Sequence, residues 1–347
     1  MSKQSYGLAF GALIFAIGVA LVLVSNGQER TRKTEAASSD SYILSGPYSY
    51  KNLSIFLLHA KQNPDNHNFL TLQEALEQKK VIVYETKNVN ELAIENTSDQ
   101  DVYVQSGDIV KGGQQDRMIG VDLIVPPKSG RIPLAAFCVE HGRWSGRGNE
   151  LAGVFSSSAD AVSTKEIKLA AKRSNSQGDV WQNVKAAQDK LSQSVGAPVN
   201  SPVSESSLQL AVENPKVQET AEGYINTLSR IVVGKDDVIG FAFAINGEVN
   251  SADVYASNTL FRKLWPKLLK ATAIEAIAEL DPQKNVSAPS AEQLSVFLSK
   301  SEQGSLEEKN VTERVTLATR ENESSILFET RDRKQKDGWV HRNYIRK

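Results

Sequence analysis

The sequence predicts an α+β protein, built mainly on antiparallel β-sheet in a sandwich-like arrangement with several packed helices, plus one N-terminal transmembrane helix. Short β-branched runs bounded by Asn, Asp, Ser or Gly follow one another through the first half of the chain. Helical spacing takes over from about Ser156, and strand-like runs return towards the C-terminus. Strands are predicted at both ends of the chain, with helices between them. This order indicates an α+β domain that is completed by its C-terminal strands.

Length and composition exclude several classes of protein. The chain has 347 residues, a formal net charge of −1 and one cysteine. It is long enough to bury a sizeable core without disulfides, and its balanced charge gives no argument for nucleic acid as a partner. One cysteine excludes an internal disulfide and a multi-cysteine metal site. The four histidines show no metal-ligand spacing, so we expect no metal site. They are His59, His67, His141 and His341.

The N-terminal segment, residues 1–24, predicts a membrane anchor. Residues 6–24 carry no charge over 19 positions, close to the roughly 20 that span a bilayer. A cleaved signal peptide, whose apolar core is usually about 7–15 residues long, is the alternative. Residues 25–44 predict a polar, flexible tether, which argues against a buried core helix. Residues 45–347 then form a single α+β domain.

The charges that flank the anchor leave its orientation open. Lys3 precedes it, whereas Arg30, Arg32 and Lys33 follow it, which by the positive-inside rule favours a cytoplasmic domain. A short N-terminus before an apolar segment instead favours a single-pass signal-anchor and export of the domain. We expect an exported domain, on the periplasmic or extracellular side, with the cytoplasmic orientation as the alternative.

The first half of the domain is predicted to be rich in strands. Thr71, followed three residues later by Glu74, predicts a short capped helix over residues 71–80. The predicted strands cover residues 52–60, 81–86, 91–96, 101–106, 118–125 and 132–140.

The second half mixes helices with hairpins. Asn246-Gly247 predicts a hairpin turn, and Pro266 predicts the first turn of a long buried helix over residues 265–280. Ser and Pro predict a loop over residues 192–207. Further helices are predicted over residues 178–193 and 217–232, hairpins over residues 238–257 and 315–330, and a final strand over residues 338–347.

The first candidate site is "KGGQQDR", which follows a strand-like run. Gly112 and Gly113 permit a turn whose backbone amides face an anion, and Gln115 can donate and accept hydrogen bonds. Arg117 offers a planar fork to phosphate or carboxylate. Neither a Walker loop nor a dinucleotide fingerprint is present, so no cofactor is expected. The alternative is a β-turn in which Asp116 or Arg117 makes a structural ion pair.

The second candidate site is "CVEHGRW", about 20 residues further on. Glu140 and His141 are candidate acid–base groups, with Glu140 as the catalytic base. Arg143 is a candidate anion ligand, and Trp144 can stack on a ring. Cys138 is expected to pack as a small apolar residue. The alternative for His141 is a polar residue at the end of a strand.

The two clusters are expected to meet. If the strands that carry them pair, their polar ends lie at one edge of a sheet, and two outcomes are open. A pocket would give a concave site. A structural network would bury Arg117 and Arg143 between Asp116 and Glu140.

The C-terminal stretch is basic. We expect a solvated strand edge here rather than a nucleic-acid surface, because only Trp339 and Tyr344 are interleaved with the charges. The basic residues are Arg331, Arg333, Lys334, Lys336, Arg342, Arg346 and Lys347.

Four stretches together resemble a known family. They are "GDIVKGGQQDR", "IPLAAFCVEHGRW", "DVIGFAFAINGEVNSADVYASNTLFRKL" and "GWVHRNYI". The family comprises domains of unknown function that are associated with ADP-ribosylglycohydrolases and rhodanese-phosphatases. The resemblance covers residues 45–347. The positions that carry it are Gly107, Gly112, Gln115, Asp116, Arg117, Cys138, Glu140, Gly142, Arg143 and Trp144.

The resemblance implies an association with ADP-ribose or other NAD-derived metabolites, but no activity. This chain departs from the family pattern at Gln114, where a lysine is common, and at Asp108, where a glutamate is common. The missing lysine weakens an anion-binding role for the glycine loop. The membrane anchor is a further departure.

Two functions remain in competition. The first is a membrane-tethered ligand-binding or interaction module, which recognises a phosphate- or ribose-bearing metabolite or a protein partner. The absence of a complete catalytic constellation favours it. The second is a hydrolase or transferase acting on an ADP-ribose-like or nucleotide-like molecule, with Glu140 as base and with Arg117 and Arg143 holding the anion.

Overall fold

A computed structural model of the protein describes residues 41–62, 67–143, 145–147, 153–162, 164–284, 287–335 and 338–347. The predicted anchor and most of the predicted tether lie outside these residues. No helix within the described ranges has both the length and the apolar character needed to cross a membrane. The described part is α+β, with large antiparallel sheets and several helices, as the sequence predicts.

An eight-stranded sheet joins the two ends of the domain. Every neighbouring pair in it is antiparallel, in the order β1-β2-β12-β13-β17-β16-β15-β14. The last strand lies inside the sheet between β13 and β16, so the C-terminus closes the domain. The strands are β1 (Tyr42–Tyr50), β2 (Leu53–Ala60), β12 (Val238–Ile245), β13 (Glu248–Tyr255), β14 (Ser305–Asn310), β15 (Val315–Glu321), β16 (Ser325–Asp332) and β17 (Gly338–Arg346).

Two smaller sheets follow from the first half of the chain. One has six strands in the order β11-β7-β8-β10-β5-β4, and the other has three in the order β3-β6-β9. The strands are β3 (Leu70–Thr71), β4 (Val81–Asn88), β5 (Glu91–Asn96), β6 (Val102–Val104), β7 (Asp108–Gly112), β8 (Arg117–Ile119), β9 (Leu123–Val125), β10 (Arg131–Cys138) and β11 (Phe155–Val162).

Helices form in all four predicted stretches, residues 71–80, 178–193, 217–232 and 265–280, with one exception in where they begin. Thr71 and Glu74 make the expected capping box at α1, with the Thr71 amide donating to Glu74 Oε2 at 2.9 Å. The predicted hairpin turn is also present, because Asn246 and Gly247 both have positive φ, at 52° and 79°. The helices are α1 (Leu72–Glu77), α2 (Lys165–Lys172), α3 (Gln177–Val195), α4 (Leu208–Val212), α5 (Pro215–Leu228), η1 (Ser229–Val232), α6 (Asn258–Ala278) and α7 (Ala291–Glu302). The helices α2, α4 and α7 were not predicted as separate elements.

The exception is α6, which begins seven residues before the predicted start, at Asn258 rather than residue 265. Ser257 caps it by accepting from the amide of Leu260 at 3.3 Å, and Pro266 lies inside the helix. Proline removes a backbone hydrogen bond, but this helix is buried on most sides, as predicted. Packing around Leu264 and Trp265 therefore outweighs the proline.

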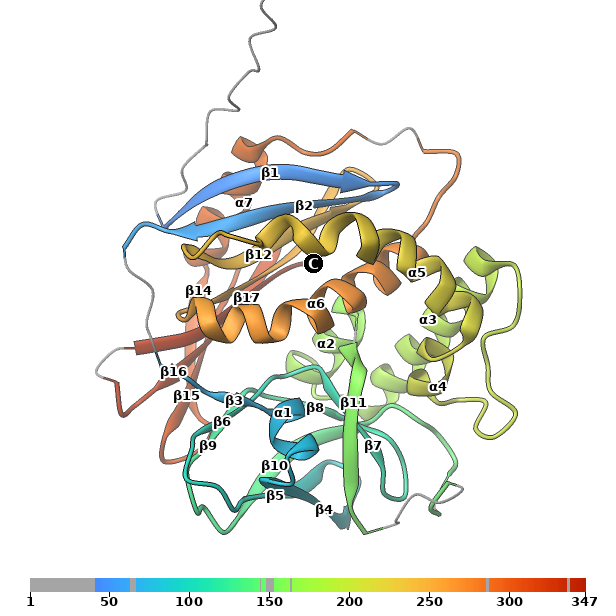
Figure 1. Ribbon diagram of the computed structural model, residues 1–347, viewed down its shortest axis with the longest axis vertical. Helices are drawn as coiled ribbons and strands as arrows, with labels where there is room; N and C mark the ends of the chain where they lie inside the picture. The colour runs from blue at the N-terminus through green and yellow to red at the C-terminus, as the bar shows by residue number, and fades with distance from the viewer. Residues whose placement is uncertain are drawn as a thin grey trace, which may run out of the picture. The chain divides into compact units, whose positions relative to one another are not determined.

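Helix α6 lies at the centre of the domain. It contacts β12 and β13 of the large sheet and β3 and β11 of the smaller sheets. Figure 1 shows it crossing the middle of the domain, with β1 and β2 above it and the strands from β3 to β11 below it. The largest apolar cluster gathers around this helix.

Two strand predictions are wrong in detail. The run over residues 118–125 splits into β8 and β9, because Asp122 turns inward and accepts from the amide of Ser106 at 2.7 Å. Strand β11 forms where helix was expected from Ser156. Its Ser- and Ala-rich sequence lacks the β-branched signal, and pairing with β7 determines its conformation.

Candidate functional site

The two predicted clusters meet, because the strands that carry them pair. Strand β8 runs antiparallel to β10, with Arg117 opposite Cys138 and Met118 opposite Phe137. The amide of Val139 then donates to the carbonyl of Asp116 at 3.0 Å. The polar residues beyond both strand ends therefore lie side by side.

A buried ion-pair network fills this meeting point. Arg143 Nε donates to Glu140 Oε1 at 2.7 Å, and its Nη2 donates to Glu140 Oε2 at 2.7 Å. The amide of Asp116 also donates to Glu140 Oε2, at 2.9 Å. Asp116 and Glu140 are both 0 % exposed. For Arg143, this geometry agrees with the network alternative.

Three members of the network were missed by sequence reasoning. Arg147 donates two hydrogen bonds to the Asp116 carboxylate, at 3.0 and 3.1 Å, and Ser207 Oγ donates to the same carboxylate at 2.8 Å. Ser204 Oγ donates to Glu140 Oε1. Both serines lie in the loop predicted over residues 192–207, and no local signal connects them to a cluster so distant in sequence.

The backbone of the glycine loop, Gly112 and Gly113, makes hydrogen bonds with the side chains of this network. The amide of Gly112 donates to Asp116 Oδ1 at 3.1 Å, and Arg143 donates to the carbonyls of Gly113 and Gly112 at 3.2 and 3.3 Å. Gly113 has a φ of +56°, and a Cβ there would lie 2.3 Å from the ring of Phe155. The glycines thus allow close packing. The Gly112 amide already donates to Asp116, so it is not available to an anionic ligand.

Arg117 lies apart from the network. Successive strand residues point to opposite sides, so Asp116 and Arg117 separate, and Arg117 shares a side with Cys138. Arg117 Nη1 lies 2.8 Å from Cys138 Sγ and 3.2 Å from Gln115 Oε1. Its ion pair with Glu85 is long, at 3.5 Å. Burial raises the pKa of Cys138, which keeps it a thiol.

The side chain of Glu140 is fully engaged. Burial by itself raises its pKa, but hydrogen bonds from Arg143 and Ser204 outweigh burial, and its pKa is lowered. A carboxylate held this way is a weak base. Burial raises the pKa of Asp116, and the neighbouring Glu140 raises it further.

His141 faces away from this carboxylate. Its backbone is fixed by Ser206, which accepts from the His141 amide at 2.9 Å and donates to its carbonyl at 2.7 Å. Its ring packs edge-on against Trp181, with the ring centres 4.5 Å apart. Trp144 lies outside the described residues.

A second buried polar cluster was not predicted. His341 lies between two aspartates, with Nδ1 2.7 Å from Asp122 Oδ2 and Nε2 3.0 Å from Asp253 Oδ1. Burial opposes the charge on His341, but both aspartates outweigh burial and its pKa is raised. Asp122 joins the cluster from between β8 and β9, so the cluster ties the large sheet to the smaller ones.

A groove lies beside the smaller sheets, against two turns of the large sheet. Its volume is about 680 Å³, within the usual range for small-molecule sites. The floor is apolar and the turns are basic. The lining residues are Ile124, Pro126, Ser129, Ile132, Thr312, Glu313, Arg314, Arg333 and Lys334.

The three cations of the groove differ in their partners. Arg314 is buried between Asp101 and Asp332, with contacts of 2.8 Å from Nη2 to Asp101 and 2.7 Å from Nη2 to Asp332. Among the described residues, Arg333 donates only to two neutral oxygens, Thr316 Oγ1 at 2.9 Å and Asn310 Oδ1. The ammonium of Lys334 forms no ion pair within 4.0 Å among the described residues. Two charges at the groove are therefore not neutralised.

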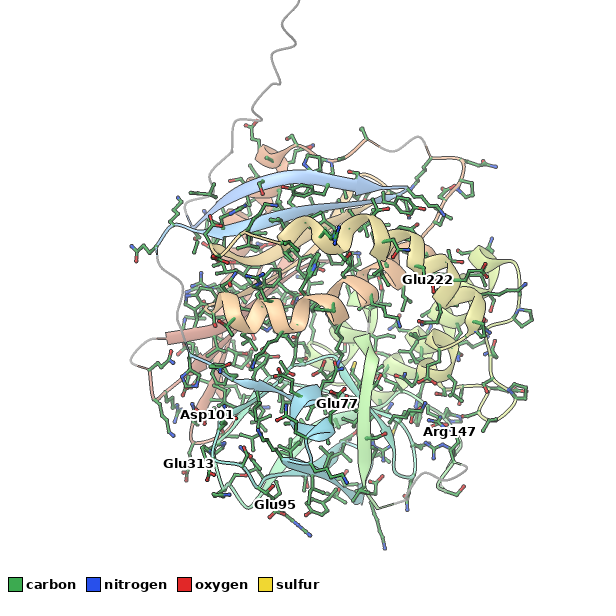
Figure 2. All side chains as sticks on the ribbon, in the orientation of Figure 1. Glu77, Glu95, Asp101, Arg147, Glu222 and Glu313 are labelled. Carbon is green, nitrogen blue, oxygen red and sulfur yellow. The ribbon has the colours of Figure 1, made fainter. Side chains whose placement is uncertain are left out.

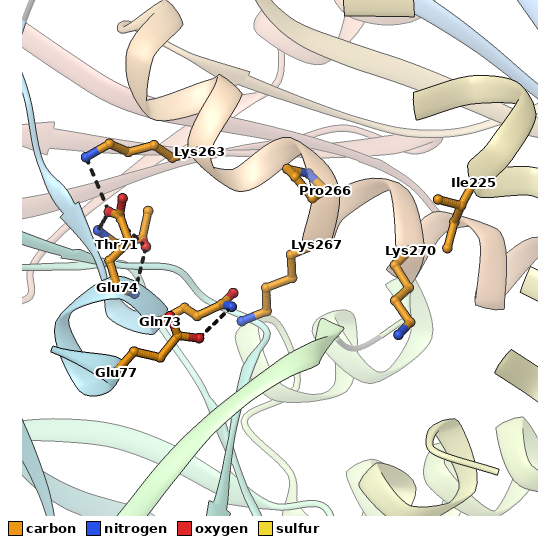
Figure 3. Close-up of a pocket in the computed structure, with 9 residues that line it drawn as sticks. All are labelled: Thr71, Gln73, Glu74, Glu77, Ile225, Lys263, Pro266, Lys267 and Lys270. Carbon is orange, nitrogen blue, oxygen red and sulfur yellow. Dashed lines mark hydrogen bonds and ion pairs between the residues drawn. The ribbon is translucent and has the colours of Figure 1, made fainter. Parts of the chain in front are cut away.

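A smaller pocket of about 350 Å³ lies between α1 and α6. Figure 3 shows Lys263, Lys267 and Lys270 projecting from α6 into this region. Lys263 pairs with Glu74 at 3.2 Å, and Lys267 pairs with Asp108 at 2.7 Å. Lys263 and Lys267 thus already have counter-charges.

The network and the groove are separate regions. Figure 2 shows Arg147 of the network on the right of the domain. On the left it shows Glu313 of the groove and Asp101, which pairs with Arg314. Within the described ranges, no group of three or more His, Cys, Asp or Glu side chains is arranged to hold a metal ion.

A comparison with models of protein families gives a match over most of the chain. The model of a family described as the ARG and Rhodanese-Phosphatase-superfamily-associated Protein domain matches residues 41–345. Comparisons with curated proteins and with solved structures give no match.

Proposed function

The chain belongs to the ARG and Rhodanese-Phosphatase-superfamily-associated Protein domain family, and from this premise we propose that it is a ligand-binding module. Its ligand is a small phosphate-bearing metabolite, and its binding site is the groove beside Ile124 and Arg333. The single observation that carries the proposal is the pairing of an apolar floor with two cations, Arg333 and Lys334, that form no ion pair with any acidic side chain in the described part of the chain.

Charge and shape together define the ligand class. A phosphate can take both free cations, and the guanidinium of Arg333 suits its geometry. Ile124, Pro126 and Ile132 offer apolar surface to a flat ring or a sugar next to the phosphate. Arg314 does not compete for the ligand, because Asp101 and Asp332 already hold it. ADP-ribose and related nucleotides combine both features.

The proposal includes a membrane tether. Residues 6–24 are the proposed anchor, because they are long enough and carry no charge. Export of the domain is the proposed orientation, because only a short N-terminus precedes the anchor, and the flanking charges are the argument for the opposite orientation. The tether would keep the domain attached to the membrane, and the domain would bind its ligand or a protein partner there.

A binding experiment on the full chain in detergent micelles tests the proposal. Thermal unfolding is followed with ADP-ribose, NAD, mononucleotides and sugar phosphates. A ligand at 100 times its Kd stabilises the fold by about 2.7 kcal/mol, which such a scan resolves readily. We expect one of these ligands to stabilise the wild type and to lose its effect in the Arg333→Ala/Lys334→Ala double variant.

The control removes the same charge elsewhere. Lys216 and Lys309 are exposed, lie outside the groove and form no ion pair among the described residues. The Lys216→Ala/Lys309→Ala variant should bind like the wild type. Equal loss in both double variants would mean that only net charge matters, and the groove would not be the site.

A further inference from the structure

Ser45, His59 and Asp237 form a chain of hydrogen bonds on the large sheet. Ser45 Oγ lies 2.7 Å from His59 Nε2, and His59 Nδ1 lies 3.0 Å from Asp237 Oδ2. Ser45 is on β1, His59 is on β2, and Asp237 directly precedes β12. These three strands lie side by side in the sheet, as Figure 1 shows. Because the three residues are far apart in sequence, no local pattern connects them.

The pairing of the strands brings these side chains together. Ile43 is opposite His59 in the β1–β2 pair, and Ser45, two residues further along β1, points to the same side of the sheet. The carbonyl of Asp237 accepts from the amide of Ala60 at 2.8 Å, which fixes Asp237 beside the end of β2. The backbone therefore holds all three members of the chain.

The chemistry of the three groups sets the direction of their hydrogen bonds. A carboxylate only accepts, so the proton between His59 and Asp237 is on Nδ1 of the imidazole. In the neutral ring Nε2 is then an acceptor, and the Ser45 hydroxyl donates to it. This is the order of donors and acceptors in a Ser-His-Asp triad, which is recognised by its geometry and not by sequence position.

The site is partly open to solvent. The side chain of His59 is 13 % exposed and that of Asp237 is 60 % exposed, while Ser45 is half-buried. Ile43, which shares their face of the sheet, is 40 % exposed. A small molecule at Ser45 would therefore meet a hydroxyl, an imidazole that is mostly shielded from water, and an apolar side chain.

A β-bulge directly follows the hydroxyl. The β1–β2 register shifts between Ser45 and Tyr48, and Gly46 has a φ of +119°. A Cβ at Gly46 would lie 2.8 Å from the carbonyl oxygen of Ile55, so a side chain does not fit there. Bulges change the direction of side chains and are over-represented next to active sites.

We propose that Ser45 is a nucleophile that takes the acyl group of a small carboxylic ester, with His59 as its general base and Asp237 as the residue that orients His59. Ser45 Oγ bonds to the carbonyl carbon, and its proton passes to His59 Nε2. The bond from that carbon to the alcohol oxygen then breaks, and His59 gives the proton to the leaving alcohol.

Water completes the reaction. A water oxygen bonds to the carbonyl carbon of the acylated Ser45, and His59 takes its proton. The bond to Ser45 Oγ breaks, His59 returns the proton to that oxygen, and a carboxylic acid leaves. Ile43 offers apolar surface to the acyl group. The site shares no residue with the proposed groove, so the two proposals stand or fall separately.

Covalent labelling tests the proposal. The full chain in detergent micelles is treated with a fluorophosphonate, from which a serine oxygen displaces fluoride at phosphorus, and peptide mass spectrometry measures the rate at each serine. Ser49 is the internal control, because it is exposed on the same strand and its Oγ lies 2.8 Å from Ser54 Oγ instead of a histidine. We expect Ser45 to be labelled about a hundredfold faster or more. Equal rates at Ser45 and Ser49 would overturn the proposal.

Ester hydrolysis gives a second readout. The wild type should hydrolyse p-nitrophenyl acetate, and Ser45→Ala should lose this activity while Ser49→Ala keeps it. Ser45 is half-buried, so its replacement by alanine should leave the fold intact, which urea unfolding checks. Equal hydrolysis by the wild type and Ser45→Ala would contradict the proposal.

Paired variants separate reactivity from structure. His59→Gln should slow labelling of Ser45 about a hundredfold, because the base is removed. Asp237→Asn should slow it as well, and Asp237→Glu, which keeps a carboxylate, should label faster than Asp237→Asn. Asp236 is the matched control, because it is the neighbouring exposed carboxylate and pairs with Arg262. Asp236→Asn should label like the wild type.

Two results would contradict these roles. A wild-type labelling rate in His59→Gln would show that Ser45 needs no base, and the proposal would fail. Equal rates in Asp237→Asn and Asp236→Asn would show that Asp237 does not orient His59.

Discussion

The network around Glu140 and the groove around Arg333 contain similar residues but treat charge in opposite ways. In the network, Asp116 and Glu140 are fully buried, and Arg143 and Arg147 neutralise both of them. In the groove, Arg333 is exposed, and its hydrogen bonds to the residues that the structure describes go only to neutral oxygens. Buried charges that are paired within the chain, as in the network, contribute to the stability of the fold. Charges that remain over a cavity are available to a ligand.

The largest expected effect comes from breaking the network. Glu140→Ala leaves Arg143 buried without its main counter-charge, and removing one partner of a buried pair costs about 3–5 kcal/mol of unfolding free energy. Urea unfolding measures the loss. Glu313→Ala, an exposed carboxylate at the groove, is the control and should cost less than about 0.5 kcal/mol. A mild Glu140→Ala with lost ligand binding would make this network the binding site.

A smaller loss is expected at the glycine loop. In Gly113→Ala the new Cβ would meet the ring of Phe155, and the backbone has a positive φ. Overpacking of this kind costs about 1–3 kcal/mol. The unfolding free energies of Gly113→Ala and Gly142→Ala are compared to separate the steric clash from the backbone strain. Gly142 also has a positive φ but has open space around it. Equal costs at both positions would show that φ alone matters.

The Asp122–His341–Asp253 cluster makes stability depend on pH. The pKa of His341 is raised, so its contribution is fully present below about 6.5 and is lost as pH rises through the folded-state value. The pKa values of both aspartates are lowered by His341 and nearby lysines despite burial, so their contribution is lost in acid below about 3.9. His341→Gln should therefore cost more at pH 6 than at pH 9. Unfolding at both values checks this, and an equal cost would mean that His341 is neutral when folded.

The smallest effect on stability is expected in the groove. Arg333 and Lys334 are exposed, so their replacement by alanine should change unfolding free energy by no more than about 0.5 kcal/mol. The variant should nevertheless no longer bind the ligand when binding is measured by calorimetry. A large loss of stability here would place these side chains in the scaffold instead.

The sequence predicts much of the fold because most of its signals are local. The capping box at Thr71 and the Asn246-Gly247 turn depend on neighbours within a few residues, and both are present. The start of α6 and strand β11 were wrong because burial and strand pairing overrode the local signals of Pro266 and Ser156.

The candidate site was only partly predictable, for a related reason. The sequence predicted that Asp116, Glu140 and Arg143 lie close together, because the pairing of the strands that carry them follows from the pattern of apolar residues. It did not separate Arg117 from them, although alternation along a strand requires it. The serine partners and the groove depend on segments distant in sequence, which one sequence does not connect. Ligand binding by Gly112 or Arg117 stays a prediction.

One measurement tests the central claim most directly. Thermal unfolding of the wild type, Arg117→Ala and Arg333→Ala/Lys334→Ala is recorded with and without the ligand that stabilises the wild type. The account predicts that Arg117→Ala melts lower but keeps its ligand-induced shift, and that the groove variant melts like the wild type but loses the shift. A shift lost in Arg117→Ala and kept in the groove variant would contradict it.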